Sequence, residues 1–419
     1  MKINIGVVQF PGSNTERETY LAVKRAGMHP IEILWNADLK AIQQCHGYII
    51  SGGFSFEDRS RAGVIASLEP IMNILKTESE KGKPMLGICN GAQILVESGL
   101  VPGALNNQTT VALADNKRIV SSQIIGKDYF NDWANLKLSV PKKNNAFTMH
   151  LDEKEILNIP FAHAEGRFII PKILLNELKQ NGQTVFRYCD PGGKTSNEFP
   201  INPNGSDYNL AAISNTAGNL LAMMPHPERT SFGDKLFSSM KEYIEKEIHF
   251  DKVELSYQYN KEKFSHYIKS ENTKTWIVDL VITDNEAITV QNALQKRGFE
   301  VLVTKQQHWE ITHSENAENI LKQIESTGEL FNSNKEYLSK IPKNKETHSL
   351  LTRQKEDVFC QKKFDSLTRR FKIKNLLELK RGVVWNITIK NAKFETILDN
   401  ILDTNILHNP LSHECFRIS

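Results

Sequence analysis

The sequence predicts an α/β protein in its first half, built on a mostly parallel, flavodoxin-like sheet, and a tandem ferredoxin-like α+β region in its second half. Short apolar runs alternate with helical patterns over residues 1–105, and further apolar runs follow between residues 185 and 224. Beyond residue 275 the sequence repeats itself. Strands that alternate with helices imply crossover connections and therefore a largely parallel, covered sheet.

The elements of the first half follow from the period of the apolar residues. We expect strands at residues 3–9, 30–34, 47–50 and 85–88, and helices at 16–26, 69–81 and 91–98. Later strands at 185–188, 210–214 and 220–224 can extend the same sheet, and an amphipathic helix at 232–248 closes it. Together these elements predict one domain over residues 1–250.

The second half is expected to hold two copies of one smaller unit. Residues 251–275 are polar and charged and are assigned as a linker, followed by repeats at 276–331 and 348–419 and a polar connector at 332–347. The expected order of elements is β-α-β-β-α-β, that of a ferredoxin-like sandwich. In each repeat two of the expected strands lie in the middle, at 299–304 and 309–312 and again at 375–380 and 383–390.

Two pairs of similar short segments support the repeat, and a chance match of amphipathic stretches is the alternative. Trp309-Glu310-Ile311-Thr312 matches Trp385-Asn386-Ile387-Thr388, and Ile320-Leu321-x-x-Ile324 matches Ile397-Leu398-x-x-Ile401. A ferredoxin-like sandwich leaves one face of its sheet bare, and a bare face needs a partner. We therefore expect the sheets of the two repeats to pack on each other within one chain.

The composition is that of an ordinary globular protein and bounds the possible functions. A chain of 419 residues is too long for one ordinary hydrophobic core, so more than one domain is expected. Its 40% hydrophobic and 24% charged residues are ordinary values, and a net charge of +3 gives no overall nucleic-acid signature. The five scattered cysteines suit a reducing compartment better than a disulfide framework. No apolar run approaches the ~18 residues of a membrane span, and the first residues form a strand pattern. We expect a cytoplasmic protein that contacts neither membrane nor nucleic acid.

A candidate nucleophile lies where an apolar strand meets a helix, in Gly87-Ile88-Cys89-Asn90-Gly91. This is the cysteine form of the nucleophile elbow, a strained strand-to-helix turn that lifts the nucleophile out of the sheet. The positive end of the following helix favours thiolate over thiol. A buried structural cysteine beside a turn is the alternative that the pentapeptide alone leaves open.

A candidate base follows an apolar strand in Met224-Pro225-His226-Pro227-Glu228. Each proline biases the residue before it toward an extended conformation, in which residues two apart point the same way. His226 and Glu228 are therefore expected to project together, so that the carboxylate orients an imidazole that deprotonates a thiol. A third candidate, the pair Gly52-Gly53 at the end of a strand, can offer backbone N–H groups to an oxyanion, with Asn90 as second donor.

Taken together, these motifs resemble the class I, or triad, glutamine amidotransferases. The residues that carry the resemblance are Gly52-Gly53-Phe54-Ser55, Gly87-Ile88-Cys89-Asn90-Gly91-Ala92-Gln93 and Met224-Pro225-His226-Pro227-Glu228-Arg229. More narrowly, residues 1–248 resemble the glutaminase subunit of phosphoribosylformylglycinamidine synthase, the PurQ type. The narrower match is carried by Gln9-Phe10-Pro11-Gly12-Ser13-Asn14, Ala162-His163-Ala164-Glu165-Gly166-Arg167-Phe168, Phe186-Arg187-Tyr188 and Asn202-Pro203-Asn204-Gly205-Ser206.

The tail resembles the small accessory subunit of the same synthase, the PurS type, in two consecutive copies. Its most family-like stretch is Ile406-Leu407-His408-Asn409-Pro410. The proline-glycine pair that usually precedes the first helix of that subunit is replaced in the first copy by Thr283-Asp284-Asn285-Glu286.

The resemblance implies a glutaminase with a catalytic triad of Cys89, His226 and Glu228. It further implies that the Gly53 and Asn90 N–H groups form the oxyanion hole and that Gly52 and Gln93 line the glutamine pocket. Ammonia would pass to a separate large synthetase subunit that binds ATP and magnesium. This chain contains no Walker-type loop, and no cofactor or metal is expected on it.

Three other functions fit parts of the sequence. The chain could be an amidotransferase of another nucleotide pathway, such as CTP or GMP synthesis, but residues 273–419 show no nucleotide-binding motif. It could be an assembly protein with a vestigial glutaminase and a purely structural tail, which the intact Cys89, His226 and Glu228 argue against. Residues 332–381, with 14 Lys or Arg against 6 Asp or Glu, could bind nucleic acid. Without clustered aromatic residues, that segment is better interpreted as a solvated or partner-facing surface.

Overall fold

The computed structural model of the chain describes residues 2–126, 128–259, 265–314, 317–390 and 394–418. It divides into two compact units, Met1–Asn260 and Lys261–Ser419, which are considered separately. None of the helices in these described ranges is long and apolar enough to cross a membrane.

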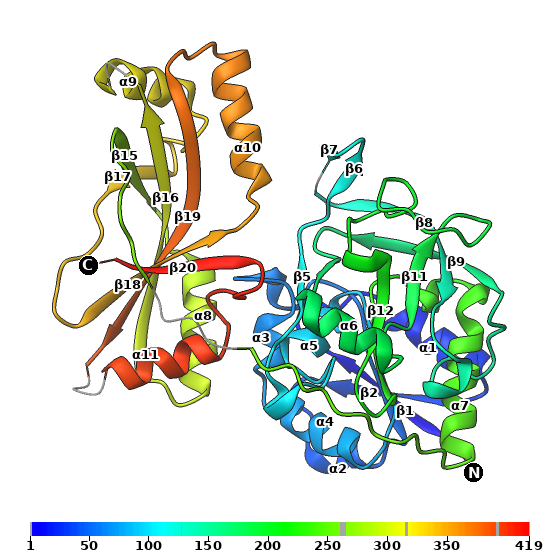
Figure 1. Cartoon of the computed structure of the whole chain (residues 1–419). Coiled ribbons are helices and arrows are strands. Elements are labelled where there is room, and N and C mark those ends of the chain that lie inside the picture. Colours follow the sequence, from blue (N-terminus) through cyan, green and yellow to red (C-terminus); the bar gives the residue numbers. More distant parts are fainter. Residues whose placement is uncertain (1, 127, 260–264, 315–316, 391–393, 419) are drawn as a thin grey trace. The chain divides into compact units, whose positions relative to one another are not determined.

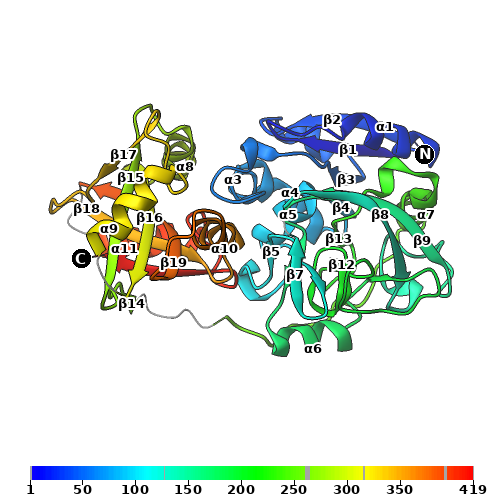
Figure 2. The same ribbon diagram turned by 90° about the horizontal axis from the view of Figure 1, so that it is seen from above.

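The first unit is built on a nine-stranded mixed sheet (Figures 1 and 2). In spatial order its strands are β2 (His29–Leu34), β1 (Asn4–Gln9), β3 (Gly47–Ile50), β4 (Met85–Ile88), β13 (Leu220–Met223), β12 (Leu210–Ser214), β11 (Phe186–Cys189), β8 (Phe130–Leu138) and β9 (Ile156–His163). Neighbours are parallel from β2 to β13 and antiparallel from β13 to β9.

The α/β class is confirmed, but the expectation of a mostly parallel sheet is wrong for the second half of this sheet. A parallel connection needs a crossover of a dozen or more residues, usually through a helix. The chain between β12 and β13 is a short turn, residues 215–219, which permits only an antiparallel pair. The expected strands near 185–188, 210–214 and 220–224 are all present as β11, β12 and β13, so their positions are confirmed.

The remaining elements of the first unit flank this sheet. Its helices are α1 (Glu16–Arg25), α2 (Leu39–Gln43), α3 (Val64–Ser67), α4 (Ile71–Glu80), α5 (Asn90–Glu97), α6 (Lys172–Gln180) and α7 (Asp234–Glu245). Two small antiparallel pairs complete it, β5 (Ala112–Ala114) with β10 (Arg167–Ile169) and β6 (Arg118–Val120) with β7 (Gln123–Gly126). The predicted helices at 16–26, 69–81 and 91–98 are confirmed as α1, α4 and α5.

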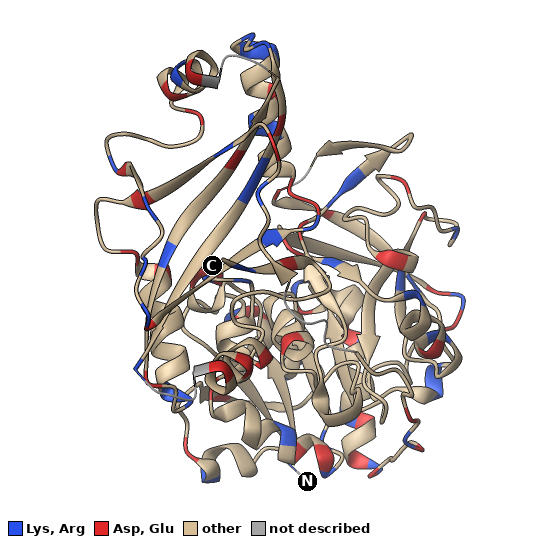
Figure 3. Ribbon diagram, turned by 60° about the vertical axis from the view of Figure 1, so that its left-hand side comes forward, with Lys and Arg blue, Asp and Glu red and all other residues tan. Residues whose placement is uncertain are grey.

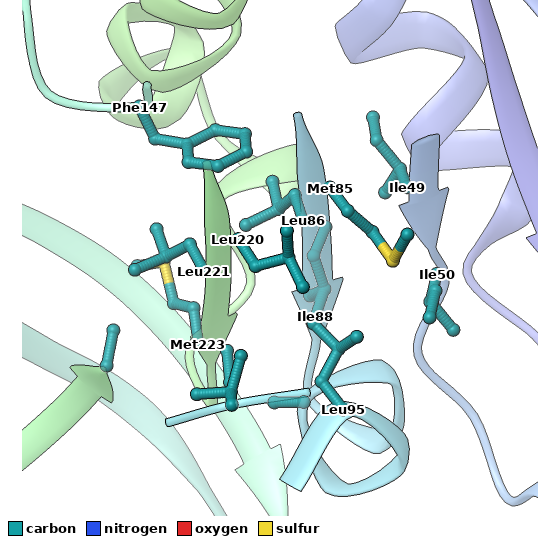
Figure 4. Packing of buried hydrophobic residues seen from close by; sticks show 14 of the residues in the cluster. Ile49, Ile50, Met85, Leu86, Ile88, Leu95, Phe147, Leu220, Leu221 and Met223 are labelled. Atoms are coloured by element: carbon teal, nitrogen blue, oxygen red, sulfur yellow. The ribbon is translucent and has the colours of Figure 1, made fainter. Parts of the chain in front are cut away.

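The core of this unit lies between its central strands and the helix that follows the elbow. Figure 4 shows side chains of β3, β4, β13 and α5 packed together, among them Ile50, Ile88, Met223 and Leu95. All four are at least nine-tenths buried. Because β3, β4 and β13 run parallel to one another, their carboxyl ends lie at one edge of the sheet, where the candidate site residues follow them.

The second unit is built on one continuous seven-stranded sheet. Its spatial order is β14 (Ser265–His266), β20 (His413–Ile418), β18 (Thr347–Gln354), β19 (Leu376–Ile389), β16 (Val301–His313), β15 (Thr273–Leu280) and β17 (Glu336–Ser339). Its helices are α8 (Asn285–Lys296), α9 (Ala317–Thr327), α10 (Val358–Asp365) and α11 (Phe394–Asp403), with a π-helical turn, Ser366–Arg370, after α10. The long strands β16 and β19 run side by side in its middle (Figure 1).

Two expectations for this unit are wrong. Each repeat holds one long central strand, β16 or β19, where two strands were expected, so its order is β-α-β-α-β. The sheets of the two repeats do not pack face to face, because β16 and β19 pair edge to edge from Val301↔Ile389 to His313↔Leu376. The polar run Lys305-Gln306-Gln307 interrupts the apolar alternation within β16, so the sequence pattern predicted two short strands there. In the sheet Gln306 is buried and accepts a hydrogen bond from Asn386 of β19.

The internal repeat itself is visible in matched contacts. The hydroxyls of Thr273 and Thr312 lie 3.0 Å apart between β15 and β16, and those of Thr347 and Thr388 lie 2.8 Å apart between β18 and β19. The aspartate that caps the first helix of each repeat pairs with a basic residue of the long strand. These pairs are Asp284 with Lys305, at 3.5 Å, and Asp357 with Arg381, at 2.7 Å.

Two segments expected to be linkers contain ordered structure. In residues 251–275, the Val253 N–H donates to the Thr216 carbonyl at 3.0 Å, and the Ser256 hydroxyl donates to Glu177 at 2.6 Å. Further along, β14 joins the sheet of the second unit. The segment 332–347 contains β17, which pairs with β15.

The basic segment 332–381 is partly neutralised within the second unit. Figure 3 shows Lys and Arg positions interspersed with acidic ones on its strands and helices. Five basic residues of the segment form ion pairs with acidic side chains: Arg353, Lys363, Arg369, Lys380 and Arg381.

Candidate active site

Cys89 lies at the tip of the predicted elbow, between the end of β4 and the start of α5. Its backbone has φ +51° and ψ −106°, in the left-handed region that side chains rarely adopt. A Cβ on Gly91 would lie 2.1 Å from the Ile50 carbonyl oxygen, and one on Gly87 would lie 2.5 Å from the Gly91 carbonyl oxygen. Both positions therefore need glycine, and the turn holds the thiol at the edge of the sheet.

His226 and Glu228 meet as predicted, but by a different backbone geometry. The segment Pro227–Arg229 is a turn of 3₁₀ helix and not an extended chain. Proline suits the first position of a helical turn because its fixed φ is already helical. The turn brings the Glu228 Oε1 atom to 2.7 Å from His226 Nδ1, and both residues are almost fully buried. The carboxylate accepts a hydrogen bond from the Nδ1–H group, which leaves Nε2 available to the Cys89 thiol.

The charge state of His226 follows from this contact. Burial alone would lower the pKa of the imidazole, but the negative charges of Glu228 and of the Cys89 thiolate, with their hydrogen bonds, raise that pKa to about 10. His226 therefore keeps its proton near neutral pH. A charged imidazole beside a cysteine suits a cysteine nucleophile with a histidine partner.

Of the two predicted oxyanion donors, Asn90 belongs to the elbow itself and Gly53 follows the neighbouring strand β3. Gly53 has φ +146°, and a Cβ there would lie 2.5 Å from the Gly12 carbonyl oxygen. Within residues 2–126 and 128–259, the backbone N–H groups of Gly53 and Asn90 donate to no protein acceptor. Gly52 has a different contact, because its N–H donates to the Thr15 hydroxyl at 2.8 Å and its Cα faces the His226 ring.

Asn90 and Gln93 belong to one buried polar chain. The Asn90 amide donates to the Gln93 Oε1 atom at 2.9 Å, and its own Oδ1 accepts the Ser55 N–H at 3.0 Å. Gln93 in turn donates to the Glu165 carbonyl at 2.6 Å. The side chain of Gln93 therefore braces the site, and its predicted contact with glutamine remains a prediction.

Sequence reasoning missed one side of the site, which β9 and the residues after it supply. The Pro160 carbonyl accepts the His226 N–H at 2.8 Å, and the Ala162 carbonyl lies 3.7 Å from the Cys89 sulfur. Thr15, which holds Gly52, was also missed. The quoted segment that begins at Ala162 was the available signal, but backbone carbonyl contacts leave no mark on the sequence.

Two carboxyl groups beside the site have raised pKa values. Burial raises the pKa of Asp58 to about 7. Burial, together with the negative charges of Asp115 and Asp58, raises the pKa of Glu165 to about 8. Near neutral pH both groups are substantially protonated, so that this side of the site carries less negative charge than its composition suggests.

The structure brings a cysteine, a histidine and a glutamate together at one edge of an α/β sheet, which is the arrangement of enzymes that use a cysteine nucleophile. The family model for the CobB/CobQ-like glutamine amidotransferase domain matches residues 2–252. The chain belongs to this glutamine amidotransferase family.

Individual relatives cover the same part of the chain. Phosphoribosylformylglycinamidine synthase subunit PurQ of Methanothrix thermoacetophila is 45% identical over 260 residues, which are 58% of this chain and 98% of the relative. The subunit of the same name from Aquifex aeolicus is 38% identical over 229 residues, 55% of this chain and 92% of the relative. A chain in the structure of PurLQS from Thermotoga maritima is 30% identical with a TM-score of 0.46, over 58% of this chain and 100% of that chain.

Proposed function

We propose that this chain is the glutaminase component of a phosphoribosylformylglycinamidine synthase, which hydrolyses glutamine and supplies ammonia for purine synthesis. The observation that carries the proposal is the Cys89, His226 and Glu228 arrangement on an elbow, with a 2.7 Å bond between the last two. The specific synthase is supported by relatives of that name, 45% and 38% identical along almost their whole lengths.

In the proposed reaction, the Cys89 thiolate attacks the side-chain amide carbon of glutamine. The Gly53 and Asn90 N–H groups receive the charge that develops on the amide oxygen. His226 passes its proton to the departing nitrogen, so that ammonia leaves and a γ-glutamyl thioester remains. Water then attacks the thioester with His226 as base, which releases glutamate and restores the thiol. Gly52 and Gln93 are proposed to shape the glutamine pocket.

The amination itself is proposed to take place on a separate large synthetase subunit. The resemblance to the family assigns ATP and magnesium to that subunit, and we assign no cofactor or metal to this chain. The tail is proposed to act as two fused copies of the accessory subunit, the first running from β15 to β17 and the second from β18 to β20. Its support is the repeated order of elements and the matched Asp–Lys and Asp–Arg pairs. We propose a cytoplasmic complex without membrane or nucleic acid.

The deciding experiment reconstitutes the full chain with the large synthetase subunit of the same cell. Cys89→Ala should abolish glutamine-dependent synthesis and leave ammonia-dependent synthesis intact, because ammonia bypasses the thiol. His226→Ala should lower glutamine-dependent turnover by orders of magnitude, since base and nucleophile act as one unit. A Cys89→Ala chain that still supported glutamine-dependent synthesis would refute the proposal.

A further inference from the structure

Residues 162–166 form a wall beside the nucleophile, which we call the pocket wall. At one end the Ala162 carbonyl lies 3.7 Å from the Cys89 sulfur. At the other end the Glu165 carbonyl accepts the Gln93 amide at 2.6 Å. A displacement of this short segment would therefore move both the carbonyl beside the Cys89 sulfur and the carbonyl that holds Gln93.

Besides Asn204, whose Nδ2 group donates to the Gly166 carbonyl at 2.8 Å, the buried side chain of Asn116 holds the pocket wall from behind. It follows β5 and is 1% exposed. Its backbone N–H donates to the Ala164 carbonyl at 2.8 Å, and its Nδ2 group donates to the His163 carbonyl at 2.6 Å. Its Oδ1 atom accepts the Gly166 N–H at 3.1 Å and lies 3.0 Å from His163 Nδ1. Asn116 thus contacts three residues of the wall, His163, Ala164 and Gly166.

His163 completes this arrangement from within the wall. Because the Asn116 Oδ1 atom can only accept, His163 Nδ1 must carry the proton. The imidazole is 3% exposed and lies against Gly166, where an added Cβ would be 2.1 Å from the ring. Burial and repulsion from His226 lower the pKa of His163 to about 3, so the ring stays neutral at every working pH. The Asn116–His163 contact is therefore a constant brace.

We propose that Asn116 and His163 are positioning residues for glutamine hydrolysis, which fix the pocket wall so that glutamine is held against Cys89. This inference rests on the proposed glutaminase function. Neither residue touches the reacting atoms. Their effect is on the shape of the pocket, and a misplacement of about 1 Å can cost on the order of a hundredfold in rate.

The chain provides a matched control in Asn219. This residue is also 1% exposed, and its amide donates to the Ser79 and Lys83 carbonyls at 2.9 and 3.0 Å. It directly precedes β13, at the opposite end of that strand from His226. Asn219→Ala removes a comparable set of buried hydrogen bonds from the same unit without touching the pocket wall.

The test measures labelling of Cys89 in the full-length chain by mass spectrometry. A diazoketone analogue of glutamine must occupy the pocket before it alkylates the thiol, whereas iodoacetamide reaches the thiol without that pocket. For Asn116→Ala we expect the half-saturating concentration of the analogue to rise by roughly tenfold to a hundredfold. The iodoacetamide rate should stay unchanged, because the triad is intact. Asn219→Ala should lower the melting temperature but label like the wild type with both reagents.

Conservative variants of His163 separate positioning from packing. The amide nitrogen of asparagine can take the place of Nδ1 and donate to Asn116, whereas that of glutamine lies one bond further out. His163→Asn should therefore keep a half-saturating concentration closer to the wild type than His163→Gln does. Wild-type labelling of Asn116→Ala, or equal losses in the two His163 variants, would overturn the inference. If the analogue failed to label the wild-type chain, the proposed function itself would fall and the inference with it.

Discussion

At the scale of single residues, the charge of His226 depends on Glu228. The pKa of His226 is raised above its ordinary value, so the ion pair contributes stability fully below about pH 6.5 and loses it as the pH rises toward 10. Glu228→Gln removes the raising charge, and the buried imidazole then loses its proton at lower pH. We expect the melting temperature of Glu228→Gln to fall furthest below the wild type near pH 6, and the gap to narrow by pH 10. Thermal unfolding at several pH values checks this, and a gap that widens with pH would contradict it.

Removing the charge of Glu165 should raise the stability of the protein, whereas removing the charge of Glu228 should lower it. The folded-state pKa of Glu165 is raised to about 8, so the native state is favoured while the carboxyl is protonated and loses stability as the pH rises from about 4.5 through 8. Glu165→Gln keeps a neutral group at that position. The variant should melt at a higher temperature than the wild type at pH 8.5 and at a similar one at pH 4.5. Glu153→Gln, at an exposed position in a turn, is the control and should show no such pH-dependent gain.

The sequence was sufficient for the residues that chemistry constrains and insufficient for those that only support them. Cys89, His226 and Glu228 stand in sequence patterns that few other roles require, so these patterns were enough to select them as candidates. Thr15 and Asn116 act through hydrogen bonds to residues far away in the sequence, such as that from the Gly52 N–H to the Thr15 hydroxyl. No local pattern distinguishes such a threonine or asparagine from one in an ordinary turn.

At the scale of elements, the elbow depends on a close approach of α5 to β3. A side chain at Gly91 would meet the Ile50 carbonyl at 2.1 Å, and backbone cannot move aside as a flexible side chain can. Gly91→Ala should destabilise the first unit by about 1–3 kcal/mol and displace Cys89. Unfolding in denaturant and labelling of Cys89 measure both effects. Gly192→Ala, where the nearest atom would be 3.4 Å away, should change neither. An elbow variant that labels and unfolds like the wild type would show that the turn tolerates a side chain.

The elements that sequence reasoning found and missed differ in how they are buried. Strands β3, β4 and β13 are buried on both faces and appear as continuous apolar runs. Strand β8 reads Phe-Asn-Asp-Trp-Ala-Asn-Leu-Lys-Leu and is exposed along much of its first half, so its strand pattern is weak. In β16 and β19 polar residues occupy the middle, where partners in the neighbouring strand satisfy them. Only the pairing of β16 with β19, which are far apart in the sequence, shows that each of them is one continuous strand.

At the scale of the whole molecule, the continuous sheet of the second unit makes its two repeats depend on each other. The sequence suggested a repeat with an exposed sheet face, but an exposed face does not decide whether the copies join face to face or edge to edge. The central ladder between β16 and β19 spans Val301 to His313 and belongs to both repeats. Tethering in one chain raises the effective concentration of the partner strand to the order of millimolar. We therefore expect the fragment 261–419 to be a monomer by light scattering and to unfold in one cooperative transition.

The test of that ladder is a proline at its centre. Gln307 of β16 pairs with Val383 of β19 on one side and with Val278 of β15 on the other, so a proline there removes a ladder hydrogen bond and clashes in the middle of the sheet. Gln307→Pro should lower the melting temperature of the whole fragment by roughly 10 °C, because neither repeat can keep its long strand alone. Lys343→Pro, in the exposed loop between β17 and β18, should leave that temperature nearly unchanged. Two separate transitions in the unaltered fragment would mean that the repeats fold as independent modules. A dimer that exchanges repeats between chains would mean that the ladder does not bind the two repeats of one chain into one unit.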